Sequence, residues 1–196
     1  MKYTYLCTGL FTINFKNMKQ GFDYYRIKTE WLSEKDTGDL QKRKTEELVL
    51  ASSYAEAEKI AYAIADDQQR SRFSDIKPEI LRTKIDDILY NDALVHEEGV
   101  LIGGLVENYF TESEDTGMGL YAVKVMFIDI DEKTAKEKRT NETIYVPAKT
   151  NIDAANFVEN YLKPSGRDFT IRDTKFDKAE AIFWPTDVQE SKMNAS

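Results

Sequence analysis

Few side chains in this sequence are of the types that do chemistry, and they do not form a recognised pattern. The single histidine, His96, lies beside Glu97 and Glu98 and could act as a general base, although an exposed loop histidine is more often a plain surface residue. The single cysteine, Cys7, alternates with threonines and is typical of a small buried hydrophobe. One histidine and one cysteine exclude a two-histidine metal motif and an intramolecular disulfide.

Two further clusters of polar or small residues do not change this interpretation. The glycines at 99, 103 and 104 do not have the spacing of a dinucleotide-binding or phosphate-binding loop. Asp129, Asp131 and Glu132 resemble half of a cation site, but they fall where a turn is expected, and aspartate is common in turns. We therefore expect no catalytic residue, no cofactor, no metal and no enzymatic activity.

Composition restricts the class of protein further. The chain has 196 residues, of which 41% are hydrophobic and 32% charged, a mixture typical of a folded globular protein. It carries 27 basic and 35 acidic side chains, a net charge of −8, which argues against a polybasic nucleic-acid-binding or membrane-binding protein. No apolar run approaches the roughly 20 residues of a membrane helix, and the N-terminus does not resemble a signal peptide. We expect a cytoplasmic protein.

An internal repeat is the main feature of the sequence. Residues 25–32 and 121–128 share the pattern Tyr, any residue, Ile or Val, Lys, two of any residue, aromatic, aliphatic. In each copy a polar turn region and a basic pair follow, and then a second alternating run. The apolar period then changes to that of a helix, with Ser53 and Thr150 as candidate N-caps. Finally, residues 83–86 match 174–177, and 88–90 match 182–184.

This repeat predicts a tandem duplication of a hairpin–helix–strand unit. We expect an α+β fold in which both copies share one core, with two helices on one face of a mostly antiparallel sheet. The predicted segments are an N-terminal strand extension (1–22), the first ββαβ repeat (23–92), a connector with an acidic loop (93–120), the second ββαβ repeat (121–187) and a flexible tail (188–196).

The strands of such a sheet expose one face that no helix covers. Taking Leu48 and Leu50 to match Ile144 and Val146 as core positions, and Ile85 to match Phe176, every repeated strand places a cation on the helix-free face. The candidate nucleic-acid-binding residues on this face are Arg26, Lys28, Arg43, Arg82, Lys84, Lys124, Arg139, Tyr145 and Lys175. The competing interpretation is an ordinary solvated sheet face, since carboxylates share it.

Residues 121–128, the following Asp131-Glu132-Lys133 and residues 136–140 resemble the family catalogued as domain of unknown function 4494, found in Bacteroidetes genomes and their phages. Residues 25–31, 48–51 and 54–58 resemble the first half of that family. The resemblance covers most of residues 24–90 and 120–184, and it implies a small cytoplasmic protein that is often borne by a phage or mobile element. It transfers no catalytic residue.

Two functions follow as expectations. The first is a non-enzymatic accessory protein that binds single-stranded nucleic acid, in phage replication for example, with the cations of the repeated strands on the phosphates. The alternative is an acidic protein-interaction module that binds or inhibits a host protein. In either case the expected location is the cytoplasm, that of the host for a phage-encoded protein, and a homo-oligomer is compatible with both.

Overall fold

The computed structural model describes residues 21–91, 93–110, 118–130 and 135–195. Its elements follow the chain in the order β1 (Asp23–Glu34), β2 (Leu40–Ala51), α1 (Tyr54–Asp67), β3 (Glu79–Arg82), β4 (Leu94–Ile102), β5 (Leu105–Phe110), β6 (Gly119–Ile130), β7 (Glu137–Ala148), α2 (Asn151–Leu162), a 3-10 turn (Lys163–Ser165), β8 (Asp168–Asp177), β9 (Ala181–Trp184) and α3 (Thr186–Met193). The predicted N-terminal strand lies outside the described residues, apart from its last two positions. The α+β class and the mostly antiparallel pairing are confirmed.

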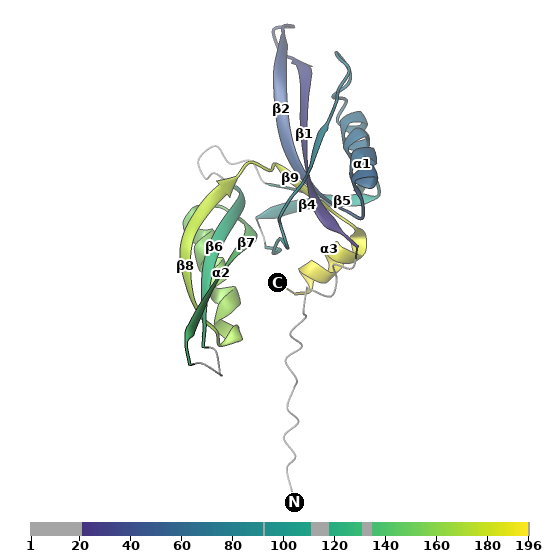
Figure 1. The fold of residues 1–196 in the computed structure, drawn as a ribbon. Helices are drawn as coiled ribbons and strands as arrows, with labels where there is room; N and C mark the ends of the chain where they lie inside the picture. Colours follow the sequence, from purple (N-terminus) through teal and green to yellow (C-terminus); the bar gives the residue numbers. More distant parts are fainter. Residues whose placement is uncertain (1–20, 92, 111–117, 131–134, 196) are drawn as a thin grey trace, which may run out of the picture.

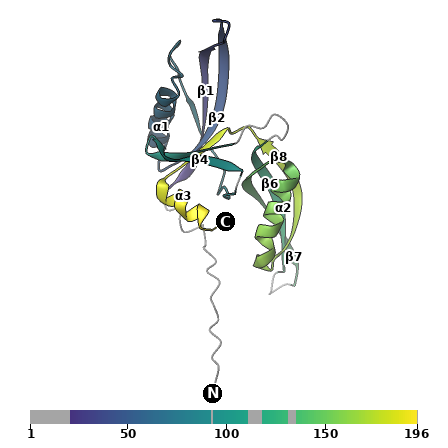
Figure 2. The same cartoon turned by 180° about the vertical axis from the view of Figure 1, so that it is seen from behind.

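The strands form two sheets, and this differs from the single sheet that we expected. One has the order β3-β1-β2-β9-β5-β4 and the other the order β7-β6-β8. Helix α1 packs on the first sheet and α2 on the second, so each helix has its own sheet (Figure 1). The two sheets extend in opposite directions from a common centre, as the view from behind also shows (Figure 2).

The two halves have the same order of elements and the same strand pairing. In each, a hairpin is followed by a helix, and the third strand then pairs antiparallel with the first strand, giving β3-β1-β2 and β8-β6-β7. Helix N-caps are also shared, since the Ser53 hydroxyl accepts from the Glu56 amide at 3.2 Å and the Thr150 hydroxyl from the Asp153 amide at 3.1 Å. A common ancestor of the two halves stays a prediction.

The register of the second strands was wrong by one residue in the sequence-based alignment. Tyr25 pairs with Val49, and its counterpart Tyr121 pairs with Val146. The turn between β6 and β7 is one residue longer than that between β1 and β2, and this shifts every later position. Because side chains alternate along a strand, Val49 faces α1, whereas Leu48 and Leu50 face the opposite side.

The match between the third strands was also displaced. Ile80 pairs with Ile27 and Thr174 pairs with Val123, so Ile80 and not Thr83 is the counterpart of Thr174. Ile85 is buried as expected, but it lies beyond β3. Phe176 was expected to be buried and is instead 56% exposed.

After its third strand, each half crosses to pair with the second strand of the other half. Ile182 of β9 pairs in parallel with Leu48 of β2, and Ile88 forms a parallel bridge with Tyr145 of β7. The predicted correspondence of 88–90 with 182–184 therefore has a structural counterpart. These crossings enclose a shared apolar cluster with residues from both halves: Tyr24, Leu48, Leu50, Ile85, Ile88, Leu94, Phe110, Leu120, Ala179, Ile182 and Trp184.

Parts of the predicted connector and tail form regular elements, whereas the predicted acidic loop at 111–117 lies outside the described residues. Residues 94–110 form the β4–β5 hairpin, and its two-residue turn is Gly103-Gly104, with φ of 61° and 84°. Positive φ at both turn positions explains this glycine pair. The expected flexible tail was wrong for its first part, because α3 buries Gln189 and Lys192.

Candidate interaction surface

The pairing of directly opposite residues shows which side chains share a face of each hairpin. In the first half, Tyr25 and Ile27 pack against α1, so Arg26, Lys28 and Glu30 point to the helix-free face. In the second half, Val123 and Val125 pack against α2, so Lys124 points away from it. The part of each face near the centre of the molecule is covered by the shared cluster, and the outer part is open. We call these open parts the outer faces.

Six of the nine candidate residues lie on the helix-free side, and three do not. Those on it are Arg26, Lys28, Lys124, Arg139, Tyr145 and Lys175. Arg43 lies opposite Trp31 and Arg82 opposite Tyr25, so both are on the α1 side. Lys84 follows the end of β3 and belongs to no strand. Arg43 was assigned to the wrong face because the second strands were aligned one residue out of register. Arg82 and Lys84 were misplaced because the third strands were matched incorrectly.

Carboxylates pair with most of the cations on the outer faces. In the first half, Lys42 and Lys44 both contact Glu30, and hydrogen bonds from Lys42 and then Lys44 lower the pKa of that carboxyl to about 2. Arg26 lies between Glu46 at 3.0 Å and Asp177 at 2.7 Å, and thereby joins the two halves.

The second half repeats this neutralisation. Arg139 contacts Glu137 at 3.1 Å and Lys175 contacts Asp173 at 3.1 Å. Within the described part of the chain, Lys124 and Arg172 are in no ion pair. The Arg172 guanidinium instead lies 3.1 Å from the Met126 sulfur. Arg172 was missed by sequence reasoning, because a β-bulge between Lys124 and Val125 turns it to this face.

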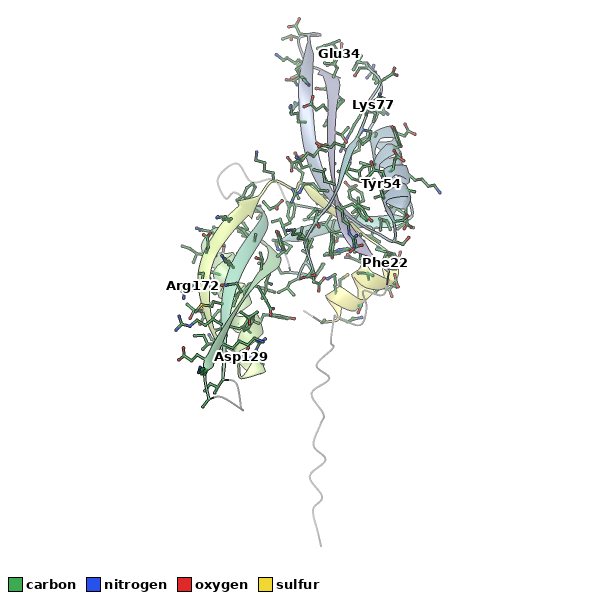
Figure 3. All side chains as sticks on the ribbon, in the orientation of Figure 1. Phe22, Glu34, Tyr54, Lys77, Asp129 and Arg172 are labelled. Carbon is green, nitrogen blue, oxygen red and sulfur yellow. The ribbon has the colours of Figure 1, made fainter. Side chains whose placement is uncertain are left out.

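Apolar side chains lie among these ion pairs, at the ends of both hairpins. Leu40 is 51% exposed and Ile130 is 71% exposed. Leu32 and Ile128 occupy equivalent positions in β1 and β6 and are half-buried on the same outer faces. Glu34 and Asp129, which mark the ends of the two hairpins, lie at opposite ends of the molecule (Figure 3). No role was assigned to these four residues from the sequence, although their even positions place Leu32 and Ile128 on the opposite face from the core-facing Trp31 and Phe127.

A buried polar network lies at the centre, between the two halves. The Trp184 indole donates to the Tyr24 hydroxyl at 2.9 Å, and the Lys192 ammonium donates at 2.7 Å to both Asp87 and the Ile88 carbonyl. Burial, and next the nearby Asp87 charge, raise the pKa of Tyr24. The adjoining cavity has a volume of about 30 Å³, room for a water molecule and not for a substrate. We infer that the role of this network is structural: it packs α3 against the centre of the molecule.

Two further properties bear on function. The described residues contain no group of three potential metal ligands. None of the helices in the described ranges is both long and apolar enough to cross a membrane.

Comparison with known proteins identifies a family. No curated protein matches the chain, and no solved structure matches it either. The model of one family, described as domain of unknown function DUF4494, matches residues 23–186. The match begins at the first residue of β1 and ends at the first residue of α3, so it includes both halves and the hairpin between them. The chain therefore belongs to the DUF4494 family.

Proposed function

We propose that the protein is a non-enzymatic protein-interaction module that binds a partner through the outer faces of its two hairpins. The observation that carries the proposal is the exposed apolar residue at each hairpin end, Leu40 and Ile130, among cations that are already paired with carboxylates. Apolar side chains bordered by polar groups are typical of the centre and rim of a protein interface.

The charge distribution favours protein over nucleic acid as the partner. A protein binds a phosphate backbone largely because its lysines and arginines neutralise the phosphates and release the counterions condensed on the nucleic acid. A cation that must first leave a carboxylate contributes less to such binding. Four cations of the outer faces are in such pairs: Lys42, Lys44, Arg139 and Lys175. We place the protein in the cytoplasm, or in the host cytoplasm if a phage encodes it.

The test is capture of a partner by the affinity-tagged full chain from lysate of the source organism, followed by calorimetry with the purified partner. The double variant Leu40→Glu/Ile130→Glu should weaken binding at least about tenfold, as expected for residues at the centre of an interface. The matched control changes two equally exposed residues on the helices, Tyr54→Glu/Ile152→Glu, and should bind normally. Undiminished binding by the hairpin variant would contradict the proposal.

A second candidate function, binding of single-stranded nucleic acid, is favoured by Lys124 and Arg172. Both are exposed on the outer face of the second half, and neither is in an ion pair within the described residues. Fluorescence anisotropy with a labelled single strand at low salt would measure such binding. Lys124→Glu/Arg172→Glu should abolish it and Lys77→Glu, distant in the other half, should not. Absence of binding at low salt would eliminate this candidate.

A further inference from the structure

Strand β8 forms one edge of the second sheet, and its outer side is open. The sheet has the order β7-β6-β8, so β8 has a strand partner on one side only among the described residues. Six of its ten residues are exposed and none is buried. Figure 1 shows β8 along the side of the molecule that faces away from the first sheet. The N–H and C=O groups along such an edge can pair with another extended segment.

The sequence of β8 is complementary to itself. If two copies of the strand pair antiparallel about a centre between Arg172 and Asp173, each arginine lies opposite an aspartate of the other copy, and Phe169 lies opposite Phe176. Opposite charges and aromatic pairs at directly opposite positions stabilise a sheet. The side chains of β8 therefore fit a second copy of the same strand in this register.

The β-bulge in β8 makes this register possible. Directly opposite residues of an antiparallel pair lie on the same face, whereas neighbouring residues of a regular strand lie on opposite faces. In a regular strand, Arg172 and Asp173 could therefore not both lie opposite each other's copies. In β8, Asp173 pairs with Lys124 and Ile171 pairs with Val125, so Arg172 is the extra residue of the bulge. Both Arg172 and Asp173 consequently point away from α2.

The residues of β8 that face α2 also match across such a pair. They are Phe169, Ile171, Thr174 and Phe176. In the register centred between Arg172 and Asp173, Phe169 lies opposite Phe176 and Ile171 opposite Thr174, so each α2-facing residue meets another. Phe176 is 56% exposed in the single chain. Phe169 of the second copy would cover that ring, which gives the pairing an apolar contribution.

The charges at the ends of the strand oppose the pairing only weakly. Asp168 would lie opposite Asp177 of the second copy, but Asp177 is already held by Arg26 at 2.7 Å. Asp173 contacts Lys175 at 3.1 Å, and both side chains are exposed. An exposed ion pair of this kind contributes little to stability, so exchanging it for a contact with the other copy costs little.

We propose that two copies of the chain associate by antiparallel pairing of β8. The two second sheets then form one continuous sheet, β7-β6-β8-β8-β6-β7, with both α2 helices on the same face. The same surface is used by both copies, as in other two-fold dimers. This inference goes beyond the proposed function, because Leu40 and Ile130 at the hairpin ends stay open. It competes with the nucleic-acid candidate, because Arg172 is paired in the dimer.

A charge exchange tests the register directly. Sedimentation equilibrium of the full chain should show a dimer with a Kd on the order of 10 μM, the weak end of specific association. Arg172→Asp and Asp173→Arg each place like charges opposite one another at two positions, and each should raise the Kd at least about tenfold. An equimolar mixture of the two variants should restore association, because every aspartate then meets an arginine. Restoration also shows that both variants are folded.

Two results would overturn the proposal: a chain that stays monomeric at millimolar concentration, or a mixture that associates no better than the single variants. The matched control is Arg139→Asp in β7, at the other edge of the same sheet, where the side chain is 59% exposed. It should leave the Kd unchanged. Amides of β8 should exchange more slowly in the dimer than in the monomer, and those of β7 should not. A dimer with unprotected β8 amides would place the contact elsewhere and refute the pairing.

Discussion

The guanidinium of Arg70 lies over the ring of Trp31, with its central carbon 4.8 Å from the ring centroid. Arg167 lies over Phe127 in the same way, at 4.0 Å. Trp31 and Phe127 are equivalent positions in the first strands of the two halves, and each arginine follows the helix of its own half. In both halves, therefore, an arginine in the segment after the helix packs on the first strand through a cation–π contact.

Arg70→Met should destabilise the protein strongly. Arg70 and Glu47 are both buried, 2.5 Å apart, so the variant leaves a carboxylate in the interior without its cation. Breaking a buried ion pair in this way costs about 3–5 kcal/mol, to be measured as the free energy of unfolding in urea. Arg167→Met is the matched control, because Arg167 and Asp129 are each 41% exposed and water replaces the lost contact. Similar losses in both variants would contradict the buried-pair argument.

Glu30 should titrate well below an ordinary glutamate. Its pKa is lowered from 4.5 to about 2 by Lys42 and Lys44. A lowered pKa means that the ion pairs stabilise the folded chain above about pH 4.5, and that this contribution disappears as the pH falls through about 2. Carboxyl NMR titration would measure the midpoint, which Lys42→Gln/Lys44→Gln should return toward 4.5. A normal midpoint in the unmodified chain would refute the pairing.

Lys192→Met should loosen α3. The change removes the hydrogen bonds to Asp87 and the Ile88 carbonyl. A hydrogen bond from a charged donor contributes about 1.5–3 kcal/mol to the stability of the fold. Amides of residues 186–193 should then exchange faster, while those of α1 remain protected. Lys192→Arg keeps the charge and should restore part of the protection. Equal exchange in the unmodified chain and the methionine variant would show that the buried ammonium does not hold the helix.

Gly119→Ala should destabilise the second half through Phe176. A Cβ at position 119 would lie 2.6 Å from the Phe176 ring. That ring packs edge-on against the Tyr121 ring, with 5.6 Å between the two ring centroids. Because the Phe176 ring is 56% exposed, it can turn toward solvent, and the cost should stay below about 1 kcal/mol, less than the range for overpacking a closed core. Phe176→Ala should suppress this cost, so a double-mutant cycle of unfolding free energies would show coupling. Additive effects would contradict the contact.

The repeated pattern was sufficient to predict the order of elements within each half, because alternation and helical periodicity are local properties. Residues 25–32 and 121–128, the Ser53 and Thr150 caps and the correspondence of Ile88 with Ile182 were all visible in the sequence. Strand register was not visible. One extra residue in the β6–β7 turn put the two second strands out of alignment by one position, so Arg43 and Leu48 were assigned to the wrong faces, and no local pattern reveals such a shift.

The sequence by itself determined the α+β class, the two similar halves and the acidic balance of charge, since composition and periodicity decide these. Only the tertiary structure decided that the halves form separate sheets, that Arg26 joins them through Asp177, and that Lys192 is buried against Asp87. Arg26 and Asp177 are 151 positions apart, and Lys192 and Asp87 are 105 apart. Contacts over such separations depend on how whole elements pack, because no short-range preference brings the partners together.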